Sequence, residues 1–295
     1  VSQASMTQRA GRAGRLEPGI CLHLTPFEQA ERAAAQGTPE ILQSDLSGLL
    51  MELLQWGCRD PAQLSWLDLP PATNLAAARR LLTQLGALAG GQPTAHGQKR
   101  AKLGSDPRLA AMLASAVGED EIATAAKLAA ILEQPPRGSS SDLAQAFLRN
   151  QSEWQQRARQ LNARLNNRGG TPDSDHVPAL LAKAFPDRIA RRRGLDGRYQ
   201  LANGMGAMLQ SDDAMTRHEW LIAPSLLQGS QSPDARILLG LAVDIDALIT
   251  ASPGLVTQSD TVEWDDAQGT LKAFRRAQIG RLTVNVKPLA KPSEE

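Results

Sequence analysis

The sequence predicts a multidomain α+β protein in which a helical part precedes a strand-rich part. At 295 residues the chain exceeds the usual length of one domain, so roughly two to four units are expected. Between residues 38 and 185 apolar side chains recur at helical spacing, interrupted by stretches rich in Pro and Gly. After residue 195 short apolar runs alternate with Gly, Asp, Ser and Asn, a pattern typical of strands and turns.

The chain begins with a run of arginines. Arg9, Arg12 and Arg15 follow one another at intervals of three residues, separated by Ala and Gly. On a helix such residues lie near one another, and small neighbours let the backbone approach a partner closely. Guanidinium groups stay charged and donate paired hydrogen bonds to phosphate oxygens. Composition alone favours the interpretation that these arginines form a solvated basic patch. The more specific alternative is that they act as arginine fingers in phosphoryl transfer.

The longer string favours the second interpretation. Gln8-Arg9-Ala10-Gly11-Arg12-Ala13-Gly14-Arg15, preceded by Ala4-Ser5, resembles motif VI of the superfamily 2 helicases in its DEAH-box variant. The resemblance implies that Gln8, Arg12 and Arg15 face the γ-phosphate of ATP, with Arg9 as a structural partner. In that family the arginines come from the second RecA-like domain. ATP with Mg²⁺ would be held mainly by N-terminal RecA-like domains of the same parent chain.

Residues 1–27 are therefore expected to be the tail of a RecA-like α/β domain. The motif helix ends near Arg15, and the apolar run Ile20–Thr25 predicts one strand. The sequence holds no G-x-x-x-x-G-K-[ST] string and no D-E-x-H string, so the phosphate cradle and the metal-binding carboxylates are missing. This chain alone is expected to be inactive as an ATPase.

Residues 28–103 predict a winged-helix domain. Thr38-Pro39-Glu40 begins a helix that runs to about Gln55, and a second helix starts at Asn74. A small hairpin follows at residues 88–94. Because the second helix offers no set of residues at base-reading spacing, a packing role is favoured over duplex recognition.

Residues 104–186 predict a helical bundle, with helices at 106–117 and 120–133 and one long helix over 142–165. The resemblance implies the ratchet domain of DEAH-box enzymes, which faces the nucleic acid strand. Arg149 and Arg157 of the long helix are then expected to contact RNA, and a solvated helix surface is an equal alternative for either arginine.

A further helix begins near His176 and is expected to continue through Phe185 to Arg193. Its Phe-Pro-Asp-Arg-Ile-Ala run is similar to a junction in DEAH-box helicases of the bacterial HrpB type. The resemblance implies that RNA passes near Arg191, Arg192 and Arg193, with Arg198 as another candidate contact. Several phosphate contacts would make binding salt-dependent, and a surface basic patch is an even alternative.

Residues 187–295 predict a small barrel or sandwich, and the resemblance implies an oligonucleotide-binding (OB-like) β-barrel. The tryptophans are expected in its core. Asp244–Ile249 predicts one helical turn whose carboxylates act as caps rather than metal ligands, and Asp265-Asp266 predicts a turn.

No metal site or nucleophilic constellation is predicted. The four histidines are scattered, and Cys21 and Cys58 are expected to be free, buried thiols of a reduced, cytoplasmic protein. No apolar run is long enough to cross a membrane, so no membrane partner is expected.

The sequence thus predicts the C-terminal portion of a DEAH-box ATP-dependent RNA helicase of the bacterial HrpB type. The family couples ATP hydrolysis to movement along nucleic acid or its unwinding, and the expected partner is single-stranded or structured RNA, with DNA as an alternative. A non-enzymatic nucleic-acid-binding or protein-docking module is the alternative function.

Overall fold

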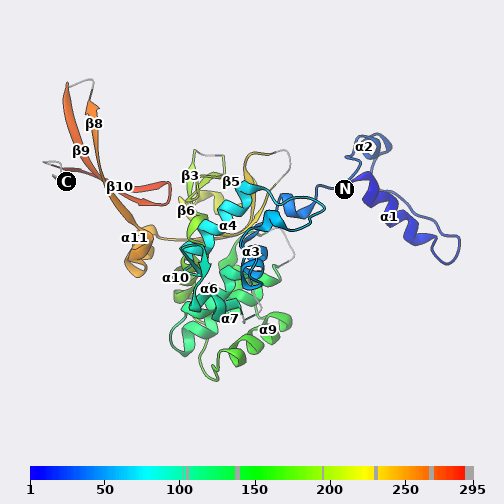
Figure 1. The fold of residues 1–295 in the computed structure, drawn as a ribbon, viewed down its shortest axis with the longest axis horizontal. Helices are drawn as coiled ribbons and strands as arrows, with labels where there is room; N and C mark the ends of the chain where they lie inside the picture. The colour runs from blue at the N-terminus through cyan, green and yellow to red at the C-terminus, as the bar shows by residue number, and fades with distance from the viewer. Residues whose placement is uncertain are drawn as a thin grey trace. The chain divides into compact units, whose positions relative to one another are not determined.

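The computed structural model describes residues 1–101, 103, 106–136, 140–194, 196–228, 232–265 and 269–289. The chain divides into two units, Val1–Ala78 and Arg79–Glu295, which are described separately. The first unit contains short helices. The second unit contains most helices and all of the sheets (Figure 1).

The first unit holds α1 (Gln3–Ala13), α2 (Phe27–Glu31), η1 (Glu40–Leu42), α3 (Ser47–Gln55), η2 (Pro61–Gln63) and the start of α4 (Ala72–Gln84). The strand predicted at Ile20–Thr25 is wrong, because this segment is exposed and irregular. A strand needs a neighbour for its backbone groups, and the described part of this unit offers none.

The single helix predicted from residue 38 to residue 55 is also wrong. A 3₁₀ turn is followed by a separate helix α3. The carboxylate of Asp45 accepts a hydrogen bond from the backbone N–H of Ser47 (2.9 Å), which forms a turn directly before α3 and inside the predicted helix. The buried residues Leu50, Leu53 and Leu54 lie on α3.

The second unit continues with β1 (Leu88–Ala89), β2 (Gln92–Pro93), α5 (Ala95–Ala101), α6 (Pro107–Ser115), α7 (Glu119–Glu133), α8 (Leu143–Leu148), α9 (Ser152–Arg164), η3 (Ser174–His176) and α10 (Val177–Ala184). The hairpin predicted at residues 88–94 is present as β1 and β2. The helices predicted at 106–117 and 120–133 are confirmed as α6 and α7. Asp106 caps α6 by accepting from the N–H of Arg108 (2.9 Å).

The long helix predicted over residues 142–165 is broken into α8 and α9. Arg149 is extended (φ −77°, ψ 146°), which ends α8. The start of α8 is tied to the barrel because the Gly240 N–H donates to the Ser141 carbonyl (2.7 Å), whereas α9 lies along α7 (Figure 1). One straight helix could not satisfy both contacts, and the polar run Arg149–Ser152 permits the break.

Five strands form a closed barrel in the order β3-β4-β5-β7-β6, with β6 returning to β3. They are β3 (Ile189–Arg193), β4 (Arg198–Leu201), β5 (Gly206–Met208), β6 (Trp220–Leu227) and β7 (Ala235–Ala242). Only the β5–β7 contact is parallel. The preceding helix ends at Ala184 rather than at Arg193, so the triple arginine belongs to a strand. A barrel is therefore present within residues 187–295, but it contains only the first five of the described strands of this region.

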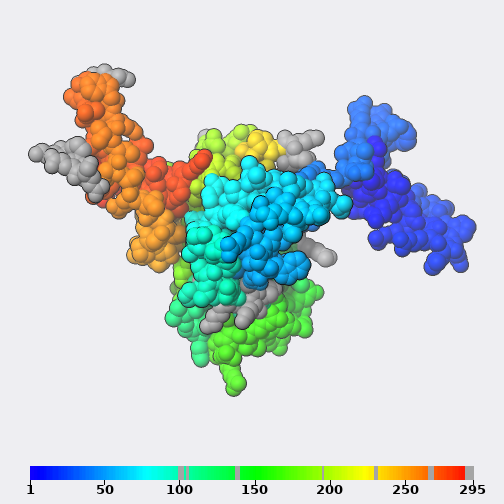
Figure 2. Space-filling model, in the orientation of Figure 1, coloured from blue at the N-terminus to red at the C-terminus, as the bar shows by residue number. Residues whose placement is uncertain are grey.

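The last three strands form a separate antiparallel sheet, β8 (Thr257–Asp265), β9 (Thr270–Ile279) and β10 (Leu282–Leu289). The prediction that these strands share one barrel with the others is wrong. Figure 2 shows β8 and β9, in orange, with side chains open to solvent on the face in view. Trp264 is 59% exposed there, against the prediction of a core position, whereas Trp220 is buried in the barrel region. The predicted turn residue Asp266 lies outside the described residues.

The turn between β9 and β10 fixes this sheet to the barrel. Gly280 has φ +55°, and a Cβ there would lie 2.3 Å from the Ala202 carbonyl oxygen, so only glycine fits. The next residue, Arg281, donates its N–H to the same carbonyl (2.8 Å). The helical turn before the sheet is α11 (Ile245–Ala251), and the Asp244 side chain caps it as predicted.

A buried ion pair joins the helices to the barrel. The Arg108 guanidinium on α6 is bidentate to the Asp187 carboxylate, at 2.6 and 3.0 Å, and its side chain is 5% exposed. It also donates to the Ala184 carbonyl (3.3 Å) and lies 5.3 Å from the centre of the Phe185 ring. Arg188 stacks on the same ring at 5.5 Å and donates to the Pro224 carbonyl of β6 (2.7 Å).

One hydrophobic core continues through this junction. Its buried members come from the helices, from barrel strands and from the base of the last sheet, for example Leu128, Leu180, Ile189, Trp220 and Leu282. A second cluster fills the barrel around Tyr199, whose hydroxyl donates to the Met215 and His218 carbonyls. The helices and the barrel therefore share buried surface.

Two further expectations concern cysteine and membranes. Both cysteines are free, but Cys21 is exposed and Cys58 is half-buried, so the prediction of buried thiols is wrong. Across the described ranges, every helix is too short or too polar to span a bilayer.

We expect Arg108→Leu to lower the free energy of unfolding by about 3–5 kcal/mol, because it leaves the Asp187 carboxylate uncompensated in a largely buried place. Equilibrium urea unfolding measures this change. Arg157→Leu is the matched control, since the Arg157–Glu133 pair is more exposed and should contribute about 1 kcal/mol or less. Equal losses in the two variants would contradict the role of the buried pair.

Candidate nucleotide and nucleic-acid interfaces

The motif-bearing helix α1 presents its arginines to solvent. It contains no buried residue, and Gln8, Arg9, Arg12 and Arg15 are all exposed. Its first turn is held instead, because the N–H groups of Gln3 and of the following alanine donate to the carbonyls of residues 34 and 35 (2.9 and 3.0 Å). The helix is therefore fixed at its beginning and open at its arginine end.

The spacing of these residues suits one anion. Gln8 and Arg12 are four residues apart on α1 and share a face, and Arg15 follows in the turn after Ala13. Within the described residues, none of these three side chains forms a hydrogen bond or ion pair with the chain itself. Two guanidinium groups and one amide are thus available for phosphate oxygens.

The arginines of β3 divide between the two sides of the strand. The side chains of Arg191 and Arg193 lie on one side of β3, and that of Arg192 lies on the other. Arg191 donates to Glu219 and to the Thr283 carbonyl (2.9 Å) and lies 5.2 Å from the centre of the Trp220 ring. Arg192 donates to the carbonyls of residues 216 and 217. Both guanidinium groups therefore stabilise the barrel.

Two exposed arginines remain at the end of this strand pair. Arg193 lies opposite Arg198 in the β3–β4 register, and both are exposed. Arg198 forms an exposed ion pair with Asp196 (3.1 Å). No described residue accepts a side-chain hydrogen bond from Arg193. This corner of the barrel thus carries positive charge that the chain only partly neutralises.

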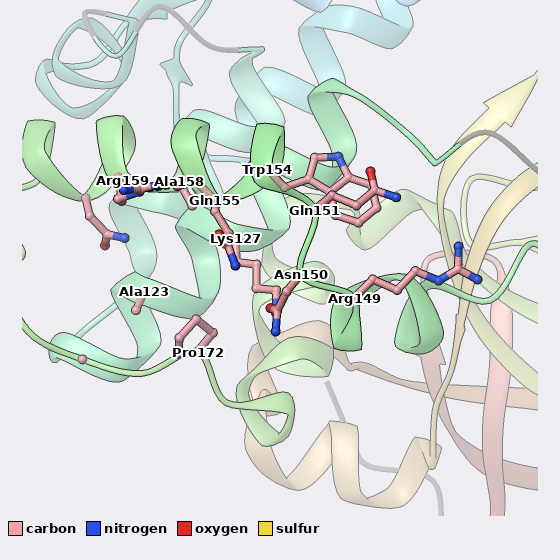
Figure 3. Close-up of a pocket in the computed structure, with 12 residues that line it drawn as sticks. Ala123, Lys127, Arg149, Asn150, Gln151, Trp154, Gln155, Ala158, Arg159 and Pro172 are labelled. Carbon is pink, nitrogen blue, oxygen red and sulfur yellow. Dashed lines mark hydrogen bonds between the residues drawn. The ribbon is translucent and has the colours of Figure 1, made fainter.

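A groove of about 470 Å³ lies between α7, α9 and the segment that joins α8 to α9. Its lining includes Gln151, the residue before α9, and five residues on one face of α9. The five are Trp154, Gln155, Ala158, Arg159 and Asn162. Figure 3 shows Arg149 and Arg159 at opposite ends of the view, with Lys127 of α7 reaching toward Asn150 between them.

Lys127 is partly desolvated in this groove. Its ammonium lies 4.6 Å from the centre of the Phe147 ring and donates a long hydrogen bond to the Asn150 side chain (3.5 Å). Burial lowers the pKa of Lys127 below its ordinary value. An anion bound here would therefore favour the charged form.

Arg157 lies outside the groove lining. Its guanidinium is bidentate to the Glu133 carboxylate at 2.6 and 2.8 Å, and this hydrogen bond raises the pKa of Arg157. Of the two predicted contacts on the bundle, Arg149 thus reaches the groove and Arg157 is held by an acid. Sequence reasoning missed Lys127, Gln151 and Gln155, which come together only through the packing of α9 on α7.

The described residues bring no three His, Cys, Asp or Glu side chains together in a way that could hold a metal ion. The interfaces are therefore characterised by arginine, lysine and amide groups. Such groups suit phosphate and base edges.

Comparison with known proteins shows what the motif-bearing exposed helix, the helical bundle and the barrel resemble. Over all 295 residues the chain is 74% identical to the ATP-dependent RNA helicase HrpB of Escherichia coli, of which it spans 36%. It is also 31% identical over 153 residues to the E. coli ATP-dependent RNA helicase HrpA. This matched region is 50% of this chain and 12% of HrpA.

Two solved structures of HrpB also resemble this chain. A crystal structure of the E. coli DExH-box NTPase HrpB superposes with a TM-score of 0.81 over 99% of this chain and 36% of its own, at 74% identity. A second, of the E. coli DEAH/RHA helicase HrpB, gives 0.82 over 100% of this chain and 37% of its own, at 70% identity. The family model for the connector region of the ATP-dependent RNA helicase HrpB matches residues 255–289. The resemblance to a DEAH-box RNA helicase of the HrpB type is confirmed.

We expect the Lys127 ammonium to titrate below 10.5, its ordinary pKa, because burial disfavours the charged form. NMR titration of the chain with ¹³C-dimethylated lysines measures this value, and the spectrum of Lys127→Arg identifies the resonance. A midpoint at or above 10.5 would contradict the desolvated position.

Proposed function

We propose that this chain is the part of an ATP-dependent RNA helicase that senses the nucleotide and grips RNA. The exposed, unpaired Gln8, Arg12 and Arg15 carry this proposal, because three phosphate-binding side chains that serve nothing within the described chain need an external anion. The helicase would couple ATP hydrolysis to movement along RNA or to its unwinding. The HrpB of E. coli carries that name, and this chain spans about a third of its length.

The γ-phosphate of ATP fits this set of residues. Guanidinium groups neutralise the charge that develops on a transferring phosphoryl group, and the Gln8 amide can orient a neighbouring oxygen or water. The remaining parts of a nucleotide site, a phosphate cradle and carboxylates for Mg²⁺, have no counterpart in the sequence. RecA-like domains of a longer parent chain would supply them, and the chain alone would be inactive.

Domain roles follow the same proposal. The barrel order β3-β4-β5-β7-β6 is that of a closed five-stranded barrel of the kind that binds oligonucleotides, so we assign it an OB-like role. The helices α6 to α10 would form the ratchet domain, and α3, α4 and the β1–β2 hairpin a winged helix. RNA would lie against the exposed Arg149 and Arg193 rather than against the acid-bound Arg157.

In the longer helicase, we expect Arg12→Ala to reduce RNA-stimulated ATP turnover by roughly 10³-fold or more, the scale of an arginine finger. RNA affinity should stay within about twofold, because Arg12 would contact the nucleotide. The exposed Arg32 of the same unit provides the control Arg32→Ala, which should leave both quantities unchanged. A parallel loss of RNA affinity in Arg12→Ala would make Arg12 a nucleic-acid contact.

We expect Arg149→Gln and Arg193→Gln each to reduce the slope of log affinity against log salt by about 0.7, the value for one lost phosphate contact on a single strand. Fluorescence anisotropy with a labelled 12-nucleotide RNA at several salt concentrations measures the slope. The double variant Arg157→Gln with Glu133→Gln keeps the net charge and should leave the slope unchanged. Unchanged slopes in the first two variants would remove both arginines from the RNA-binding surface.

A further inference from the structure

The groove between α7 and α9 has a composition that phosphate binding does not explain. Four of its lining side chains are carboxamides, and its cations lie around them. The carboxamides are Asn150, Gln151, Gln155 and Asn162. Each carries both donors and an acceptor, whereas a phosphate needs donors alone. The amides therefore match a ligand that presents donors and acceptors together.

Two of these amides are available to a ligand. Gln151, the extended residue directly before α9, and Gln155 on α9 are exposed, and within the described chain their side chains form no hydrogen bond. The other two are partly used, because Asn150 accepts from Lys127 (3.5 Å) and Asn162 accepts from Asn167 (3.0 Å). Both available amides belong to residues that line the groove.

The groove also has apolar walls. The Trp154 side chain contributes to its lining although it is buried, and its indole N–H is already occupied by the Gln134 carbonyl (2.9 Å). Ala123, Ala158 and Pro172 add small apolar surface (Figure 3). A flat, partly apolar group can therefore lie between α9 and the 170–172 segment without displacing a hydrogen bond of the indole.

The size and the charge of the groove limit which ligands can bind in it. The volume of about 470 Å³ lies within the range of roughly 300–1,000 Å³ that holds single small molecules. The lining contains Lys127, Arg149 and Arg159 and no carboxylate. Asp120 and Asp173 line the adjoining hollow, where Asp120 accepts from the backbone N–H of Thr171 (2.7 Å). A planar polar group attached to anions fits all of these properties.

We infer that this groove holds one unstacked nucleobase of a bound RNA strand. Gln151 and Gln155 read its hydrogen-bonding edge, Trp154 and the small apolar residues contact its face, and Lys127 and Arg159 bind the flanking phosphates. This inference rests on the proposed function and adds to it base contact by the bundle. Single-stranded RNA is read in this way, through splayed bases held by edge contacts and apolar surfaces.

The test compares two fluorescent 12-nucleotide probes, oligouridylate and a ribose-phosphate strand of equal length without bases. Because a held base contributes about 1–3 kcal/mol, the wild-type chain should bind oligouridylate at least about fivefold more tightly than the abasic strand. The double variant Gln151→Ala with Gln155→Ala should reduce this ratio by about fivefold or more. Its affinity for the abasic strand and its salt slope should match the wild type.

Gln156→Ala is the matched control, since Gln156 is an exposed glutamine on the same helix that does not line the groove, and it should keep the wild-type ratio. Far-ultraviolet circular dichroism and thermal melting verify the fold of each variant. An unchanged ratio in the double variant overturns the base pocket and leaves the helicase proposal intact. An equal loss for both probes also overturns it, because the glutamines would then contact the strand backbone. Failure of the wild-type chain to bind either probe overturns both proposals.

Discussion

The buried ion pair between Arg108 and Asp187 is the interaction on which the arrangement of the second unit depends. The arginine comes from the first helix of the bundle, and the aspartate lies two residues before the first barrel strand. The guanidinium groups of Arg108 and Arg188 both lie against the Phe185 ring, at 5.3 and 5.5 Å from its centre, and that of Arg188 reaches the backbone of β6. A charge so placed is costly without its partner, so the pair specifies one geometry for the junction.

That geometry has consequences for the candidate RNA-binding surfaces. The groove is formed by α7 and α9, whereas the exposed Arg193 lies at the end of β3. The helices and the barrel share one buried core, which holds these two surfaces in one arrangement. The start of α8 is joined to β7 through Ser141, whose side chain also donates to Asp213 (2.6 Å). A strand of RNA that touches both surfaces would therefore meet a preformed arrangement, which limits the entropy lost on binding.

Sequence reasoning succeeded where the signal was local. The caps Asp106 and Asp244 and the β1–β2 hairpin follow from neighbouring residues, and all are present. It failed where distant contacts decide. The break at Arg149 depends on β7 and α7 together, and a strand at Ile20–Thr25 needs a sheet that the described part of its unit does not contain.

The candidate sites show the same division. The motif residues Gln8, Arg12 and Arg15 could be selected from one string, and their exposure agrees with an external anion. The three arginines of β3 look equivalent in sequence, but Glu219 and carbonyl acceptors on β10 and η5 (Ala214–Arg217) occupy two of them. Which arginine is available depends on tertiary partners that no spacing reveals.

Bundle and barrel form one cooperative unit through their shared core and the Arg108–Asp187 junction. Native-state hydrogen exchange with increasing denaturant can compare the amides of α10 with those of β3 and β6. We expect the most protected amides of these three elements to converge on one opening free energy and one denaturant dependence. Opening of α10 at a distinctly lower free energy, with β3 and β6 still protected, would contradict it.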